Sequence, residues 1–273
     1  MATTLTCDLT TTSGAPQPNS VIQVDRVMSE LNHRLYRQHM MYTARVTLGT
    51  DAQTSRIDVY ALAPTWYVIN SLRSAKRVHD EAMKEERSLV GQARWYDFRI
   101  DQDIPLGEEL QPAGLDKTSL ALTAVSRTGS EYASSQIHDG AGNNKVFRLV
   151  GASSATGFNV FEEYDAMGNV SDNPQTPATG GYDNVYALVD APNMEDLLNR
   201  GNAPPYDTDT WNVVWVKVGE LYRTATGTQS VSTGYFDAPL GLIYIPNYAQ
   251  TTNGVLRLEV KAGKYKGVQA VPL

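Results

Sequence analysis

Turn-forming segments recur along the chain from Gly91 onward, and their frequency constrains the possible folds more than any other feature of the sequence. Segments such as GAGNN at 140–144 and NPQTP at 173–177 favour chain reversal, because Gly tolerates positive φ and Pro fixes φ. Between the turns, polar and apolar residues alternate as they do in half-buried strands. We therefore expect a mainly β protein, a jelly-roll type antiparallel β-sandwich with a few helices in its connections.

The strand pattern recurs along most of the chain. The predicted strands cover residues 41–48, 56–62, 94–100, 118–126, 145–151, 157–164, 184–189, 211–221, 229–236, 240–246 and 254–261. Helices are expected at about 26–38, 66–90 and 193–200, the first with Asp25 as its N-cap.

One folded unit is expected. Residues 1–20 are rich in Thr and end in GAPQPN, so they read as an extended arm with little power to fold alone. Residues 21–273 then form a single sandwich with elaborated loops, long enough to bury a core without cross-links. Cys7 is the only cysteine, which rules out an intrachain disulfide and a zinc cluster.

The net charge of −7 is unevenly distributed. Residues 1–100 carry twelve Lys and Arg against ten Asp and Glu, whereas residues 101–273 carry eleven against twenty. This asymmetry suggests two surfaces in different environments. The sequence predicts no secretory signal peptide and no membrane-spanning segment.

A group of arginines near the start of the chain is the candidate for contact with nucleic acid, because the guanidinium group matches phosphate. The alternative is helix surface and salt bridges between subunits, which the neighbouring Asp25 and Glu30 favour. The candidate residues are Arg26, Arg34, Arg37 and Arg45.

The tryptophans are the candidates for a subunit interface. They are Trp66, Trp95, Trp211 and Trp215. Trp211 and Trp215 are four residues apart in one predicted strand and so share a face. A sugar-binding platform would have this form, but packing in a core or an interface is the commoner use of such residues.

Residues 149–199 contain no Lys or Arg and many acidic side chains. The segment DAMGN at 165–169 resembles a calcium loop, although its spacing departs from the helix–loop–helix pattern. A calcium site between subunits stays a possible interpretation of this segment, but a solvated loop is the favoured one. No other cofactor is expected.

Catalytic machinery is not expected. The four histidines show no metal-ligand spacing, and no phosphate-binding loop or nucleophile elbow is present. A Ser-His-Asp triad stays open, because its members need not be close in sequence. The histidines are His33, His39, His79 and His138.

Three segments together resemble the coat proteins of small icosahedral viruses, especially environmental viruses with circular single-stranded DNA. They are LNHRLYRQ at 31–38, the stretch from APTWY at 63–67 to ARWYDFR at 93–99, and FDAPLGLI at 236–243. The resemblance covers the layout of most of the chain. It implies a jelly roll, symmetric self-assembly into a shell and enclosure of a genome, with no catalytic residues to transfer.

The resemblance fails at the N-terminus, where many such coats carry a strongly basic arm and this chain is Thr-rich and neutral. Packaged nucleic acid is therefore expected to bind weakly and without sequence specificity. The expected function is a capsid subunit of a virion, assembled in the cytoplasm or nucleus of a host cell. The alternative is a β-sandwich binding module, such as a phage tail or carbohydrate-binding protein.

Overall fold

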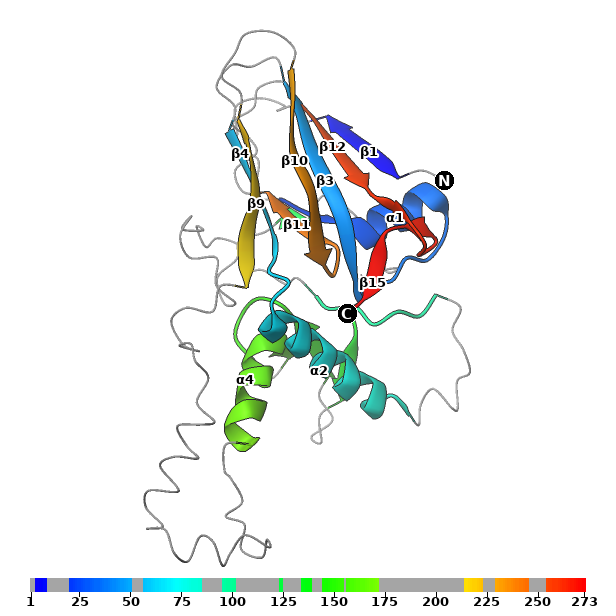
Figure 1. Cartoon of the computed structure of the whole chain (residues 1–273). Helices are drawn as coiled ribbons and strands as arrows, with labels where there is room; N and C mark the ends of the chain where they lie inside the picture. Colours follow the sequence, from blue (N-terminus) through cyan, green and yellow to red (C-terminus); the bar gives the residue numbers. More distant parts are fainter. Residues whose placement is uncertain are drawn as a thin grey trace, which may run out of the picture.

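The protein is built mainly from antiparallel β-sheets, with helices in the connections (Figure 1). The described residues form two five-stranded sheets and two smaller sheets of two and three strands. The computed structural model describes residues 3–8, 20–50, 56–84, 95–101, 123–124, 134–138, 144–154, 156–171, 214–222, 229–245 and 254–273.

The first sheet has the strand order β1-β12-β3-β10, with β15 also paired to β3, and every pairing is antiparallel. Along β3 the side chains of Tyr42, Ala44 and Val46 are buried, whereas those of Thr43 and Arg45 between them lie on the outer face. The strands are β1 (Thr4–Asp8), β3 (Met40–Thr50), β10 (Gln229–Pro239), β12 (Gly254–Val260) and β15 (Ala270–Pro272).

The second sheet has the order β5-β2-β11-β4-β9 and is antiparallel except for the β2–β5 pair. Both of its faces are covered. Ile57 and Ile243 pack in the core shared with the first sheet, whereas Tyr60 and Tyr244 pack in a second core on the opposite side. The strands are β2 (Ser20–Gln23), β4 (Arg56–Leu62), β5 (Thr123–Ala124), β9 (Trp215–Tyr222) and β11 (Leu242–Ile245).

The two large sheets share one core. Tyr42 and Val46 of the first sheet and Val59 and Ile243 of the second belong to the same buried cluster. Burial of each such side chain contributes about 1.5–3 kcal/mol, so this cluster is a major stabilising element. The prediction of a mainly β protein with antiparallel sheets is confirmed, and the arrangement is compatible with a sandwich.

The long strands pair in nested order. β1 pairs with β12, β2 with β11, β3 with β10 and β4 with β9. Leu240 and Gly241, with φ of 56° and 64°, form the turn that takes the chain from β10 in the first sheet to β11 in the second. A Cβ on Gly241 would lie 3.0 Å from both Tyr42 Cδ2 and Val24 Cβ, so the turn requires glycine on two grounds.

A long insertion, residues 63–214, connects β4 to β9 and supplies the second core. Its helices α2 and α4 lie below the sheets in Figure 1. Thr65 caps α2, accepting a hydrogen bond of 3.4 Å from Val68 N. The elements are α2 (Trp66–Ala82), β6 (Gln136–His138), β7 (Asn144–Arg148), β8 (Gly157–Asn159) and α4 (Val160–Ser171).

Two smaller elements complete the fold. Helix α1 (Val24–Asn32) connects β2 to β3, and a hairpin of β13 (Ala262–Gly263) and β14 (Gly267–Val268) precedes β15. None of the helices in the described residues combines the length and apolar character needed to cross a bilayer.

The predicted helix at 26–38 is too long at its C-terminal end. α1 ends at Asn32 because His33 adopts a φ of 46°, and residues 34–39 form a loop. Asp25 is not an N-cap: it lies in the first turn of α1 and is fully buried. The helix predicted at 66–90 is α2, which ends at Ala82, and residues 85–94 lie outside the described residues.

The predicted strand at 157–164 is wrong in its second half. Asn159 Oδ1 accepts hydrogen bonds from Phe161 N (2.9 Å) and Glu162 N (3.2 Å), which starts α4 at Val160. Asn followed three residues later by Glu is a helix-start signal that outweighs the β-favouring Val and Phe between them. Residues 165–169 therefore lie in a helix, not in a calcium-type loop.

The predicted strand at 94–100 is also wrong where it is described, because residues 95–100 lack regular structure. Their main chain bonds to side chains and loops, as in the 2.7 Å bond from Ile100 N to Gln38 Oε1. Inside the expected arm, Thr4–Asp8 forms β1. The strand predicted at 184–189 and the helix at 193–200 lie outside the described residues.

Candidate functional site

The structure separates the four candidate arginines. Arg34 and Arg37 are exposed in the loop after α1, and Arg26 lies half-buried within α1. Arg45 lies on the outer face of β3, where it forms a 2.6 Å ion pair with Glu259 and stacks 4.8 Å from the ring centre of Tyr235. Of the four, Arg34 and Arg37 are the neighbouring exposed pair and form no ion pair with a described carboxylate, although the charge of Arg37 acts on the buried Asp97.

Residues 33–39 form the loop that bears Arg34 and Arg37, and we call it the arginine loop. A surface hollow of about 470 Å³ borders this loop beside the β13–β14 hairpin. We call it the basic hollow, because it contains three cations and no acidic side chain. Its lining residues are Arg37, Met40, Lys264, Tyr265, Lys266, Ala270 and Pro272.

The positive charges of the hollow act on one another. Partial burial lowers the pKa of Lys266, the charges of Arg37 and Arg34 lower it further, and the charge of Asp97 opposes them without reversing the direction. The Lys266 ammonium donates a hydrogen bond to Leu35 O, a neutral acceptor. The site thus holds positive charge that a bound anion would neutralise.

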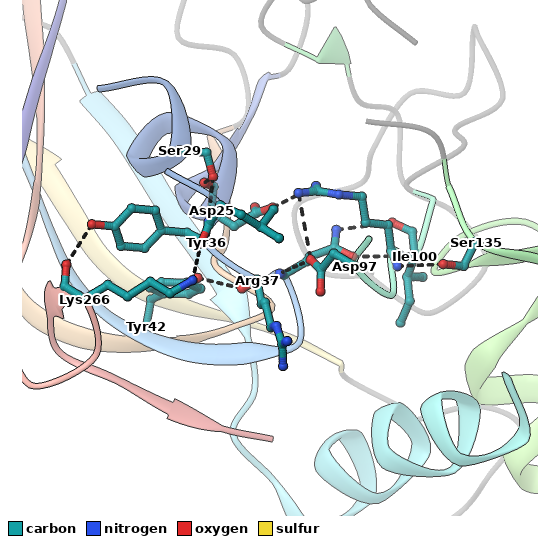
Figure 2. Close-up of polar contacts among 12 residues, drawn as sticks. Asp25, Ser29, Tyr36, Arg37, Tyr42, Asp97, Ile100, Ser135 and Lys266 are labelled. Atoms are coloured by element: carbon teal, nitrogen blue, oxygen red, sulfur yellow. Dashed lines mark hydrogen bonds and ion pairs between the residues drawn. The ribbon is translucent and has the colours of Figure 1, made fainter. Parts of the chain in front are cut away.

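Hydrogen bonds fix the main chain on both sides of the hollow (Figure 2). Tyr36 N donates to Ser29 Oγ at 2.9 Å, which ties the loop to α1. The hydroxyl of Tyr36 donates to Lys266 O at 2.8 Å, which ties the loop to the hairpin. The segments that carry Arg37 and Lys266 are therefore held in fixed relation.

Arg37 itself is clamped through its main chain. Its carbonyl accepts a 2.6 Å hydrogen bond from the Tyr42 hydroxyl, and its N–H donates to the Tyr265 hydroxyl at 3.2 Å. The guanidinium extends away from this network in Figure 2. The side chain can therefore meet a ligand without moving the backbone.

A buried ionic network lies behind the loop. Arg99 Nη1 is 2.9 Å from Asp25 Oδ2, and Arg99 Nη2 is 3.8 Å from Asp97 Oδ2. Asp97 Oδ2 also accepts a 2.8 Å hydrogen bond from Gln38 N, so the network reaches the end of the arginine loop. Burial raises the pKa of Asp25 and raises the pKa of Asp97 to about 6, against the lowering effect of Arg99.

Comparison with protein-family models, with curated proteins and with solved structures finds no match. Function is therefore inferred from the residues themselves.

The tryptophans fall into two groups. Trp66 and Trp95 are 69% and 61% exposed, as an interface residue of an isolated subunit would be. Trp215 is only 3% exposed and packs edge-on against Tyr244 at 5.9 Å, so it is a core residue and its prediction as an interface residue is wrong. Trp211 lies outside the described residues. A sugar platform built on Trp211 and Trp215 has no support, because Trp215 does not reach the surface.

The buried histidines belong to packed regions. His79 stacks on Tyr96, with ring centres 6.0 Å apart, and also contacts Phe98 and Phe147. Burial lowers the pKa of His39 to about 4. Within the described residues, no group of three or more His, Cys, Asp or Glu side chains is placed to hold a metal ion.

Lys264 and Lys266 were not among the candidate residues predicted from the sequence. The segment KYK at 264–266 places a tyrosine between two lysines, a pattern typical of phosphate-binding surfaces. Its partner Arg37 is more than two hundred residues away in sequence, so only the folded chain brings the two segments together.

The raised pKa of Asp97 predicts a pH effect on stability. The folded protein retains this proton up to about pH 6, whereas the unfolded chain releases it near 3.8. The stabilising contribution of the protonated group is therefore complete at low pH and is lost as the pH rises through about 6. Relative to Asp97→Asn, the unmodified protein should lose about 2 kcal/mol of unfolding free energy between pH 4 and pH 7.

Urea denaturation of both proteins at each pH measures this difference. Asp25 and His39 are present in both, so their titration largely cancels. A difference that does not change with pH, or that changes in the opposite direction, would contradict a raised pKa at Asp97.

Proposed function

We propose that this chain is a jelly-roll capsid subunit that self-assembles into an icosahedral shell around a viral genome. The observation that carries the proposal is the nested pairing of the long strands. A jelly roll is one long antiparallel hairpin of eight strands, rolled so that successive strands fall in opposite sheets. The first strand then pairs with the eighth, the second with the seventh, and so on inward.

The strand order of this chain supports a roll of this kind. The nested pairs β1·β12, β2·β11, β3·β10 and β4·β9 alternate between the two sheets. Two further pairings, β12 with β3 and β11 with β4, join these pairs into sheets of four long strands. The short β5 and β15 add to the edge of one sheet and to the end of β3 in the other.

A jelly roll alone does not determine function, because capsids, lectins and cupins share it. Two features favour the capsid. The first is the resemblance of three segments to viral coat proteins. These segments contain the end of α1 with the arginine loop, the start of α2, and the turn between β10 and β11. Trp66 and Trp95 expose large aromatic surfaces of the kind enriched in protein interfaces.

Negative-stain electron microscopy of the purified protein tests the proposal. Closed particles of uniform diameter are expected at one or more combinations of salt and pH, because a shell forms through repeated symmetric contacts. Light scattering on the same samples gives the mass. A protein that stays monomeric at every salt concentration and pH would count against a shell.

A further inference from the structure

We infer that the basic hollow binds the phosphodiester backbone of nucleic acid through Arg37, Lys264 and Lys266, with Arg34 adding charge from the adjoining loop, without reading base sequence. The choice of nucleic acid as the polyanion rests on the proposed function. The location of the site rests on the charges and contacts of the described residues.

The charge balance singles out this surface. A second hollow, of about 340 Å³, lies beside the C-terminal Leu273 and contains Arg73, Lys76 and Arg77, but Asp80 and Glu81 line it too. Lys76 is paired with Asp80 there. No acidic side chain lines the basic hollow; Asp97 acts on its Lys266 and Arg37, but the lining itself carries three cations, which favours an anion.

The donors suit phosphate oxygens. The Arg37 guanidinium offers several N–H groups in a plane, and the exposed Lys264 ammonium adds a compact charge. Lys266 lies partly buried between them, with a pKa lowered by burial and by Arg37 and Arg34. A bound phosphate would relieve this repulsion, which makes binding more favourable than at isolated cations.

The site is also preorganised. The Tyr36–Lys266 and Arg37–Tyr265 hydrogen bonds, 2.8 Å and 3.2 Å long, join the two segments that supply its cations. The backbone therefore loses little conformational freedom on binding, which reduces the entropic cost of binding. Contacts from Arg and Lys to phosphate oxygens carry no sequence information, so sequence-independent binding is expected.

The test measures binding of a fluorescently labelled, mixed-sequence single-stranded oligonucleotide by anisotropy over a range of salt concentrations. Arg37→Gln/Lys264→Gln removes two exposed cations and spares Tyr36, Tyr265 and Lys266. Affinity at low salt should fall at least tenfold, and the slope of log K against log salt should become shallower by about 1.4. Thermal unfolding should match that of the unmodified protein.

The matched control is Arg257→Gln/Lys261→Gln, which removes two exposed cations on or next to β12. Both double variants change the net charge equally, so the control should keep the affinity and slope of the unmodified protein. Equal losses in the two variants would overturn the site, because bulk charge alone would then explain binding. An unmodified protein that binds no oligonucleotide would overturn it as well.

Two further arms identify the ligand. At equal ionic strength, inorganic phosphate should displace the oligonucleotide much more weakly than an unlabelled strand does, since one phosphate makes fewer contacts. Equal displacement would overturn a polyanion site.

Anionic vesicles should not bind to the protein. Vesicle binding that requires Arg37 and Lys264, with oligonucleotide binding unaffected, would overturn nucleic acid as the partner. Shells that form without oligonucleotide binding overturn this inference alone. Binding by a protein that never assembles overturns the proposed function alone.

Discussion

Arg99→Met is expected to lower the free energy of unfolding by about 3–5 kcal/mol at pH 7. The side chain of Arg99 is only 6% exposed, and it lies between the buried carboxylates of Asp25 and Asp97. Methionine fills similar space without charge, so both carboxylates would be left without their cation in a nonpolar environment. Chemical denaturation followed by fluorescence measures the loss.

The loss should shrink as the pH falls toward about 6 and then level off, because the pKa of Asp97 is higher still without Arg99 and the variant takes up the proton first. Adding Asp25→Asn and Asp97→Asn to Arg99→Met should restore most of the stability, since no buried charge remains. Arg45→Met is the control: it breaks the more exposed pair with Glu259 and should cost far less. Similar losses for Arg45→Met and Arg99→Met would contradict the difference in burial on which this prediction depends.

Trp215→Ala is expected to lower the free energy of unfolding by about 3–5 kcal/mol. Trp215 is buried in the second core, where it packs against Tyr244 and helps join the second sheet to the insertion. Removal of the indole would leave a cavity that the surrounding strands cannot close. Thermal and urea denaturation of the purified variant measure the effect.

Trp66→Ala is the matched control, since Trp66 is exposed at the start of α2. It should change unfolding by less than about 0.5 kcal/mol. Under the proposed function it should nevertheless reduce the yield of closed particles. Equal destabilisation by both substitutions would contradict the different placement of the two tryptophans.

Strand alternation made most of the two large sheets predictable. The segments at 41–48, 56–62, 229–236 and 254–261 correspond to β3, β4, β10 and β12, because polar and apolar residues alternate along them. Alternation could not show that both faces of the second sheet are covered. The continuous apolar run of β11, LIYI, was the available sign of two buried faces. Trp215 of β9, on the other side of β4, packs on the same side as Tyr244 of β11.

The candidate site was predictable only in part. Arg34 and Arg37 stood out as arginines, but nothing local separates them from Arg45, whose partner Glu259 comes from a strand far along the chain. Lys264 and Lys266 meet the arginine loop only through long-range hydrogen bonds. The sequence shows which residues are charged, whereas tertiary contacts decide which of these charges have an oppositely charged partner.

The nested strand order also has a consequence for how the chain folds. The innermost pair, β4 with β9, encloses residues 63–214, so its formation closes the longest loop and carries the largest entropic cost. Once it has formed, β3 meets β10, then β2 meets β11, and finally β1 meets β12, each across short added connections. Folding should therefore have one slow first step, closure of the loop 63–214, after which the other strand pairs form in sequence. The folding rate should depend on the length of this insertion more than on the sheets.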